Sequence, residues 1–301
     1  MKIIALYTCF NRREKTLTSI KSLYDSLDFY NNHNVESIDL EVYLTDDGCT
    51  DGTAESVKST FPDKDIHILK GDGNLYWAGG MRLCWKEAIK NNHNNSCDYY
   101  LLVNDDTILQ QNCFSELFSA ESYCRKYHSQ EGLISGITCS SLDDKEITYG
   151  GDVIVNRLTG KSKRMGICAT PQMVDIVNAN ILLVPNHVVD EIGIFYEGYK
   201  HSGADNDYSM MAREHGIPVL VTSNVCGVCD NDHHDADVDS RRIIGMTLSE
   251  RKKYFYHPLH TINDYLTFVK RHMIMRYPLS WLFCLMRIYI PKLYYRFNRI
   301  R

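Results

Sequence analysis

The sequence lacks any long apolar run. Its most apolar stretch, residues 279–286, has eight residues, whereas a helix that spans a bilayer needs about 20. The amino-terminal segment has an apolar run of only four residues before Tyr7 and no small-residue cleavage site, so it predicts a first strand rather than a signal peptide. We therefore expect a chain that works in the cytoplasm and does not cross a membrane.

The cysteines lack the pattern of a disulfide framework or of a zinc site. The chain has 11 of them, an odd number, scattered mostly through apolar segments, which fits reduced, buried thiols in a cytosolic protein. Cys226 and Cys229 form the one close pair, with His233 and His234 just beyond. Because a structural zinc site needs four ligands and no second such pair exists, we do not predict one.

The sequence also lacks internal repeats, low-complexity stretches and linkers rich in Pro, Gly or Ser. Its 301 residues are 44% hydrophobic and 24% charged. These values are close to the average of soluble globular proteins and exclude a disordered chain, a collagen and a coiled coil. The length is enough to bury a large core. The economical interpretation is one compact domain over residues 1–250, with an appendage over residues 251–301.

The net charge of −5 conceals two regions of opposite charge. Residues 251–301 carry 11 Lys and Arg against a single acidic residue, Asp264, so this segment has a charge of +10 while the first 250 residues have −15. The segment also holds 12 of the 33 aromatic residues. Aromatic and basic residues interleaved on short helices are typical of an element that lies on an anionic membrane surface. The alternative is a helical cap packed on the core. Nothing else in the chain supports a nucleic-acid partner.

Strand and helix patterns alternate through the first half of the chain. Apolar runs predict four strands, at residues 2–7, 40–45, 65–70 and 99–103. Apolar residues at three- and four-residue spacing predict four helices, at residues 14–30, 51–60, 80–92 and 112–127. The pattern is rich in strands from residue 130 to 185 and then returns to a helix near residues 205–215. Such alternation predicts an α/β fold with a mainly parallel central sheet flanked by helices.

The four predicted strands all end in polar or Gly-rich sequence, at residues 8–12, 46–53, 71–80 and 104–106. In an open α/β sheet, ligands bind beyond the carboxyl ends of the strands. Neighbouring carboxylates there repel each other unless a proton or a cation joins them, and they suit Mg²⁺ or Mn²⁺ held together with a substrate's phosphates. Each segment taken alone could be a turn, a helix cap or, at Gly79 and Gly80, close packing. Four of them at one edge favour a binding site.

These segments, in this order, resemble a family 2 glycosyltransferase with the GT-A (Rossmann-like) fold, of the type that builds bacterial cell-surface polysaccharides. Residues 178–180 before an apolar strand are similar to the strand behind that family's acceptor site. Residues 201–208, His-Ser-Gly-Ala-Asp-Asn-Asp-Tyr, resemble its acceptor-side acidic motif. The resemblance covers about residues 1–225, and its specificity lies in the ordered set of motifs.

The resemblance implies a nucleotide-sugar half over about residues 1–106 and an acceptor half over about residues 107–250. Thr8 and Phe10 would flank the nucleotide base, and Asp46 or Asp47 would accept a hydrogen bond from it. Glycine-containing backbone would approach the nucleotide, with Arg82 near its phosphates. The full set implied for the nucleotide sugar is Thr8, Phe10, Arg12, Asp46, Asp47, Gly73, Asn74, Gly79, Gly80, Arg82, Asn104 and Asp105.

The family's metal-binding motif falls on residues 104–106, where Asn104 replaces the first carboxylate of the commonest form. This implies Asp106 as a direct ligand of Mn²⁺ or Mg²⁺, with Asp105 touching the metal or the ribose. His233 and His234 are further candidate ligands, the alternative being a solvated loop. Asp205 matches the general base, and its alternative is a carboxylate at a helix N-terminus, favoured by the dipole. The implied acceptor side comprises Trp77, Asn180, His201 and Asp207.

The predicted function is an inverting, metal-dependent glycosyltransferase. It would move a sugar from a UDP- or dTDP-sugar to a glycan hydroxyl, on a polyprenyl-linked acceptor, at the inner face of the cytoplasmic membrane. Two alternatives stay open. A sugar nucleotidyltransferase would carry a Gly-rich loop directly after the first strand, and residues 8–13 have no glycine. A non-catalytic subunit with the same fold would not need to keep Asp105, Asp106 and Asp205 together.

Overall fold

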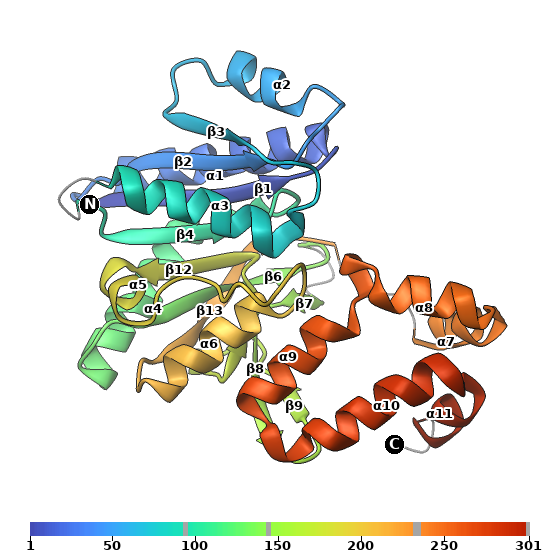
Figure 1. The fold of residues 1–301 in the computed structure, drawn as a ribbon. Coiled ribbons are helices and arrows are strands. Elements are labelled where there is room, and N and C mark those ends of the chain that lie inside the picture. Colours follow the sequence, from blue (N-terminus) through green and yellow to red (C-terminus); the bar gives the residue numbers. More distant parts are fainter. Residues whose placement is uncertain (93–95, 143–145, 231–235, 299–301) are drawn as a thin grey trace.

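The computed structural model describes residues 1–92, 96–142, 146–230 and 236–298. It shows a sheet covered by helices on both faces, with a helical unit formed by the end of the chain beside it (Figure 1). The predicted α/β fold with a mainly parallel central sheet is confirmed.

The four predicted strands pair in parallel at one side of the central sheet, in the order β4 (Tyr99–Val103), β1 (Lys2–Cys9), β2 (Asp39–Asp46) and β3 (Ile66–Lys70). Beyond β4 the sheet continues through β12 (Ile181–Pro185), which is antiparallel to its neighbours, and then β6 (Leu133–Cys139), β13 (Val219–Val228) and β10 (Gln172–Met173). Two short strands add to it, β5 (Ile108–Leu109) and β7 (Ile147–Tyr149). A small antiparallel sheet holds β8 (Gly151–Asn156), β9 (Lys161–Arg164) and β11 (Ile176–Val177).

The helices bury the two faces of the central sheet in two separate cores. Along β4, Leu101 and Val103 enter one core while Leu102 enters the other, because successive strand residues point to opposite faces. The first core lies under α1 (Arg13–His33), α2 (Thr53–Thr60) and α4 (Cys113–His128). The second lies under α3 (Tyr76–Asn91), α5 (Asn186–Ile192) and α6 (Ala204–Glu214).

Helix α3 packs tightly on the sheet at Gly80. A Cβ atom added there would lie 2.0 Å from Thr8 Oγ1, and the Gly80 carbonyl accepts a 2.8 Å hydrogen bond from Thr45 Oγ1. We predict that Gly80→Ala lowers the free energy of unfolding by about 1–3 kcal/mol, because the extra methyl group forces a buried shift. Denaturant unfolding measures it. The control is Gly245→Ala, whose added Cβ meets nothing within 4 Å, and equal effects of the two variants would contradict the explanation.

The end of the chain forms a helical unit with its own small core. It comprises α7 (Ala236–Gly245), α8 (Leu248–Tyr256), α9 (Ile262–His272), α10 (Tyr277–Tyr289) and α11 (Pro291–Asn298). Ile243, Phe255, Ile262, Cys284 and Ile288 pack together inside it. The unit therefore includes α7 and the start of α8, which precede the predicted boundary at residue 251. Helix α9 packs against α6 (Figure 1). Among the described residues, no helix has the length and apolar character needed to cross a membrane.

Candidate active site

Two adjoining cavities open at the carboxyl ends of β1, β2 and β4. They have volumes of about 390 and 350 Å³ and share Arg12, Trp77, Asp105 and His201. The first is also lined by the predicted residues Thr8, Phe10, Asp47 and Gly73. The second is also lined by the predicted residues Asn104, Asp106, Asn180 and Asp205. The edge of the sheet thus brings together residues predicted for the donor, the metal, the base and the acceptor.

Arg12 joins the two carboxylates between the cavities. Its Nη1 lies 3.1 Å from Asp105 Oδ1, and its Nη2 donates to Asp106 Oδ2. Burial raises the pKa of Asp105 to about 7, although Arg12 acts in the opposite direction. Two buried, adjacent carboxylates are stabilised in their ionised form by positive charge, and their hard oxygen atoms suit Mg²⁺ or Mn²⁺. Asp105 and Asp106 therefore fit a divalent cation.

Asp47 shapes the first cavity by ordering the loop before α3. Its carboxylate accepts three hydrogen bonds from backbone N–H groups, those of Gly73 at 2.9 Å and of Leu75 and Tyr76 at 3.0 Å each. Gly73 has a φ of +83°, a left-handed conformation that glycine adopts at little cost. Asp47 is buried, so much of its accepting capacity serves the loop.

Trp77 holds Asn104 in place at the second cavity. Its Nε1–H donates a 2.8 Å hydrogen bond to Asn104 Oδ1, and its ring packs against Phe195 with the centroids 5.5 Å apart. The indole is thus both a wall of the two cavities and a support for the residue that precedes the carboxylate pair.

Asp205 lies in the first turn of α6 and lines the second cavity. Its Oδ2 accepts a hydrogen bond of 3.1 Å from the Ala179 N–H, and its Oδ1 accepts one of 2.9 Å from the Asn206 N–H. Burial raises the pKa of this carboxyl, against these hydrogen bonds. A carboxylate held in a fixed orientation with a raised pKa is suited to remove a proton.

Asp207 lines neither cavity and instead connects α6 to the helical unit. Its Oδ1 accepts hydrogen bonds from Arg271 at 2.5 Å, His272 Nε2 at 2.7 Å and the Tyr199 hydroxyl at 3.0 Å. Glu214 faces the other ring nitrogen of His272 at 3.0 Å. The carboxylate of Asp207 is buried among these partners, so the structure places it between α6 and the helical unit, and its predicted acceptor role stays a prediction.

This cluster predicts a pH-dependent contribution to stability. Burial alone would lower the pKa of His272, but hydrogen bonds to Asp207 and Glu214 raise it. The stabilisation by protonated His272 is therefore complete below about pH 6.5, the pKa of an unperturbed histidine. It is lost as the pH rises through the raised pKa of His272 in the folded protein. Burial alone would raise the pKa of Asp207, but His272 and Arg271 lower it, so its contribution is lost only as the pH falls through that lowered value.

We therefore expect His272→Gln to destabilise the protein by about 2 kcal/mol near pH 5.5, the value of a charged hydrogen bond. The difference from wild type should shrink as the pH rises above about 6.5. Urea unfolding at a series of pH values measures it, with the same substitution in an Asp207→Asn background as the control. A cost that stays constant from about pH 5.5 to about pH 9 would show that the imidazolium charge contributes nothing.

Five residues predicted for the nucleotide sugar lie outside the linings of both cavities. Arg82 donates to the carbonyls of Tyr196 and Tyr199 at 3.1 and 2.9 Å. Asp46 accepts from the Cys49 N–H, and Asn74 sits in an exposed turn closed by Asp72. The remaining two, Gly79 and Gly80, are buried where α3 packs on the sheet. In this structure these residues support the site rather than line it. His233 and His234 lie outside the described residues.

Sequence reasoning missed residues that reach the first cavity from the end of the chain. His257 and Leu259 line it together with Tyr76. Asp264 accepts backbone hydrogen bonds from Lys200, His201 and Ser202, at 3.2, 2.9 and 3.0 Å. Asp264 therefore holds the loop that leads to Asp205. The sequence did contain a signal for Asp264, which is the single acidic residue of the strongly basic segment 251–301.

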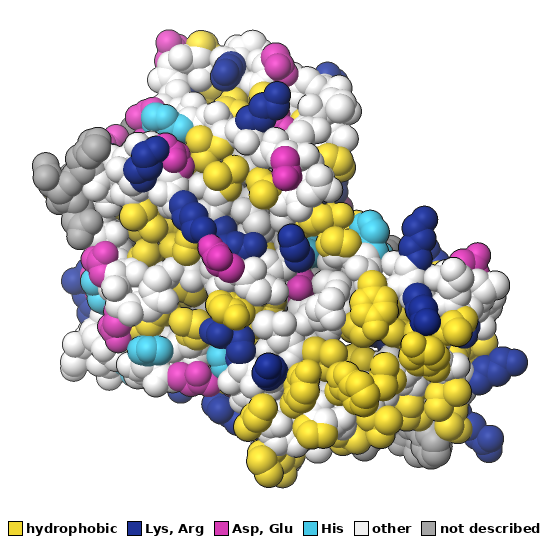
Figure 2. All heavy atoms as spheres, in the orientation of Figure 1, with side chains coloured by type: hydrophobic (Ala, Val, Ile, Leu, Met, Phe, Trp, Pro, Cys, Tyr) yellow, Lys and Arg dark blue, Asp and Glu magenta, His cyan; other side chains and the backbone are white. Residues whose placement is uncertain are grey.

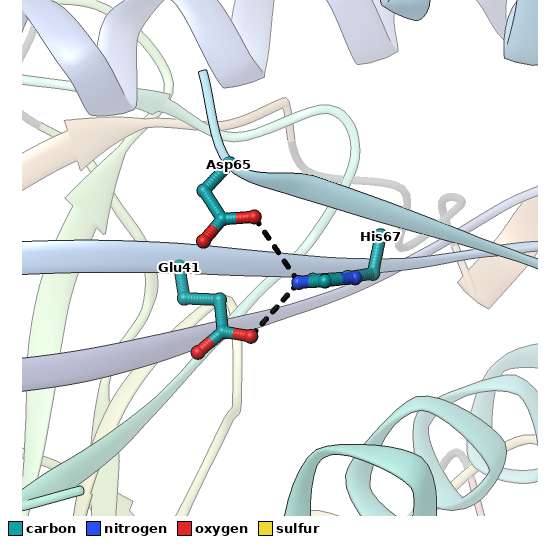
Figure 3. A group of neighbouring side chains, drawn as sticks. All are labelled: Glu41, Asp65 and His67. Carbon is teal, nitrogen blue, oxygen red and sulfur yellow. Dashed lines mark ion pairs between the residues drawn. The ribbon is translucent and has the colours of Figure 1, made fainter. Parts of the chain in front are cut away.

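A second group of possible metal ligands lies at the opposite end of the strands. Glu41, Asp65 and His67 have one ligand atom each within 4.8 Å of one another. His67 Nε2 lies 2.8 Å from Glu41 Oε1 and 3.1 Å from Asp65 Oδ1 (Figure 3). Lys2 Nζ also pairs with Glu41 at 3.0 Å. Lys2 partly neutralises this group, which lies near the amino ends of β2 and β3, away from the cavities.

Sequence and structure comparisons with known proteins point to the same fold as the sheet and its binding edge. Residues 5–120 match the family model described as Glycosyl transferase family 2, whereas no curated protein sequence matches the chain. S. aureus TarS 1–349 in complex with UDP has a TM-score of 0.59 at 13% identity, over 100% of this chain and 92% of that one. The mannosyltransferase PcManGT from Pyrobaculum calidifontis, in complex with GDP-Man and Mn²⁺, has a TM-score of 0.52 at 12% identity, over 94% of this chain and 74% of that one. These likenesses confirm the predicted GT-A fold.

Proposed function

We propose that this chain, which belongs to the family 2 glycosyltransferases, moves a sugar from a UDP- or dTDP-sugar to a hydroxyl group of a glycan. The transfer inverts the configuration at the anomeric carbon. The observation that carries the proposal is one shared cavity. The carboxylate pair Asp105 and Asp106 and the candidate base Asp205 line the same space of about 350 Å³. Leaving-group stabilisation and proton removal can therefore act on one bound sugar.

The donor would occupy both cavities. Its base would lie in the first one, against Thr8, Phe10 and Tyr76, and its diphosphate near Arg12. A divalent cation, Mn²⁺ or Mg²⁺, held by Asp105 and Asp106 would supply positive charge to the departing nucleoside diphosphate. Arg12 adds a fixed positive charge at the same place, which favours the negative charge that develops as the bond to the sugar breaks. The complexes of TarS with UDP and with UDP-GlcNAc support a nucleotide sugar as the donor.

Asp205 would act as the general base on the acceptor. It removes the proton of the acceptor hydroxyl while that oxygen attacks the anomeric carbon from the face opposite the diphosphate, which inverts the configuration. The raised pKa makes the carboxylate a stronger base than an exposed aspartate. Its two backbone hydrogen bonds fix its orientation, and Asn180 and His201 line the space in front of it.

A panel of nucleotides tests the donor assignment. Ligands that bind only the folded state raise its stability, by about 2.7 kcal/mol at a concentration 100-fold above Kd. We expect UDP- or dTDP-sugars with Mn²⁺ to raise Tm in a thermal-shift experiment, and to release the nucleoside diphosphate on incubation. Stabilisation by nucleoside triphosphates and sugar 1-phosphates instead would favour a nucleotidyltransferase. Binding without turnover for any donor and acceptor would favour a non-catalytic subunit.

The surface of the helical unit supports a lipid-linked acceptor at an anionic membrane. Exposed apolar side chains gather there, namely Ile274, Met275, Leu279, Trp281, Leu282, Tyr289, Ile290 and Leu293. Figure 2 shows a wide yellow area of hydrophobic side chains over α10, with Lys and Arg side chains beside it. Apolar patches of this kind mark protein or membrane contacts, and the basic residues favour an anionic leaflet. We assign the enzyme to the inner face of the cytoplasmic membrane, in cell-surface polysaccharide synthesis.

Substitution on the exposed face of α10 tests the membrane contact without removing helices that line the active site. We expect the double variant Trp281→Ser and Leu282→Ser to bind phosphatidylglycerol vesicles about tenfold more weakly than wild type, because it loses buried apolar area in the interface. Flotation of the full chain measures the binding. The control is the double variant Val155→Ser and Leu158→Ser, which changes equally exposed apolar residues elsewhere. Equal binding by all three proteins would rule out this surface.

A further inference from the structure

A third cavity lies between the start of α6 and the helices α9, α10 and α11. It has a volume of about 580 Å³. Aromatic side chains from all three of these helices line it, among them Tyr265, Phe268 and Phe283. Two arginines, Arg276 and Arg287, line it as well. Aromatic surface together with two cations suits a ligand that is both apolar and anionic.

This cavity adjoins the one that contains Asp205. Ser202, Gly203 and Asn206 line both this cavity and the one that contains Asp205. The loop that separates the two spaces is the one that Asp264 holds through three backbone hydrogen bonds. A molecule that reached past this loop would have one end at the candidate base and the other among the arginines.

The two arginines have no carboxylate partner in the described part of the chain. No ion pair with a described residue involves Arg276. Arg287 donates to the Tyr295 hydroxyl at 3.1 Å and stacks over Phe255, with its Cζ 4.7 Å from the ring centroid. Asp264 also lines the cavity, but its carboxylate already accepts from three N–H groups. The positive charge of the cavity is thus available to an anion, and guanidinium groups match phosphate in shape and charge.

The helix α10, which lines the cavity, also carries exposed apolar side chains on its other faces. Ser280, Phe283, Cys284 and Arg287 of α10 line the cavity, while Trp281 and Leu282 of that helix are about half exposed, at 49% and 47%. The cavity thus combines a polar loop shared with the site of Asp205, two arginines and aromatic side chains. This combination suits a molecule that carries a sugar, a phosphate group and an apolar chain.

We propose that the cavity between α6 and α9–α11 binds the phosphate group and the first apolar carbons of a lipid-linked sugar acceptor, with Arg276 and Arg287 on the phosphate. The inference rests on the proposed function, because it concerns the acceptor of the same reaction. It adds a binding site that discriminates a lipid-linked sugar from a free one.

Geranyl diphosphate is a soluble probe that carries both features. We expect it to bind the full chain in isothermal titration calorimetry, in the presence of EDTA and saturating UDP so that the donor cavities are filled. Pyrophosphate and geraniol should each bind at least about tenfold more weakly, since each lacks one half of the recognition. Arg276→Gln should weaken geranyl diphosphate binding about tenfold, the value of one charged hydrogen bond. Lys292→Gln, at an exposed position on α11, should leave it unchanged.

Arg287 is partly buried, so binding by Arg287→Gln is interpreted only if the unfolding curve of this variant matches that of wild type. If the curves differ, Arg276→Gln alone tests the proposal. Equal binding of pyrophosphate, or equal loss in the Lys292 variant, would show nonspecific attraction by the basic surface and overturn the proposal. Probe binding that occurs without UDP but is lost when UDP is saturating would place the probe in the donor cavities and overturn the proposal too. Nucleotide-sugar stabilisation of the same protein is measured in parallel. If that persists while geranyl diphosphate does not bind, this inference fails and the proposed function stands.

Discussion

Replacing Asp205 by Asn is expected to lower kcat by about 10³-fold, within the range that general-base catalysis contributes. The amide has nearly the same shape but cannot accept the acceptor's proton. The expected loss is specific to turnover, because Asp205 lines the second cavity and not the first, where the nucleotide base would lie. Stabilisation by the nucleotide sugar with Mn²⁺ should therefore match wild type. Release of the nucleoside diphosphate measures the rate.

The Asp205 variant needs a control for structure, since the wild-type carboxylate accepts hydrogen bonds from Ala179 and Asn206. An amide can keep only part of this pattern. Asp63→Asn, at an exposed position, is the matched substitution and should retain wild-type turnover. If Asp205→Asn lost turnover and nucleotide binding together, the residue would be structural. If it kept wild-type turnover, another group would be the base.

The second large effect is expected at Asp106. Its carboxylate lines the second cavity beside Arg12 and Cys229. Asp106→Asn removes half of the carboxylate pair that fits a divalent cation, so we expect kcat/KM to fall about 10²–10³-fold, a loss of several kcal/mol in stabilisation of the leaving group. The increase in Tm that Mn²⁺ adds to nucleotide binding should disappear. Both readouts use the full chain.

The group of Glu41, Asp65 and His67 provides the control. Asp65→Asn removes one of its carboxylates at the other end of the strands, and we expect it to leave the Mn²⁺-dependent stabilisation by nucleotide intact. The opposite pattern, in which Asp65→Asn removes this stabilisation and Asp106→Asn does not, would place the functional cation at the amino ends of β2 and β3.

The sheet and its carboxyl edge could be predicted from sequence because their signals are local. Each apolar run that predicted a parallel strand is followed by its own polar segment, and parallel strands bring these segments to one edge. The contributions of individual residues in those segments depended on packing. Gly80 and Asp47 are residue types expected in a nucleotide-binding loop. In the structure, however, Gly80 allows α3 to approach Thr8, and Asp47 accepts hydrogen bonds from the loop before α3. Residue type alone cannot separate these roles.

Contacts between distant segments were beyond the sequence patterns. The region rich in predicted strands proved to be a set of short strands, with β11 and β12 separated by residues 178–180. There the Asn178 N–H bonds to Gly150 and the Ala179 N–H to Asp205. The link from Asp207 to Arg271 and His272 joins residues more than 60 positions apart. Such pairs carry no periodic signal. The sequence therefore favoured a membrane-surface element for the basic segment and left a helical cap on the core as the alternative, and in the structure α9 packs on α6.

We propose that the enzyme transfers a sugar from a nucleotide donor with inversion, in the cavity lined by Asp105, Asp106 and Asp205. The most direct test is time-resolved NMR of the anomeric proton when the full chain acts on a UDP- or dTDP-sugar with Mn²⁺. We expect the transferred or hydrolysed sugar to appear first with the configuration opposite to that of the donor, and we expect Asp205→Asn to show no such signal on the same timescale. A product with the donor's own configuration, or equal conversion by Asp205→Asn, would contradict the proposal.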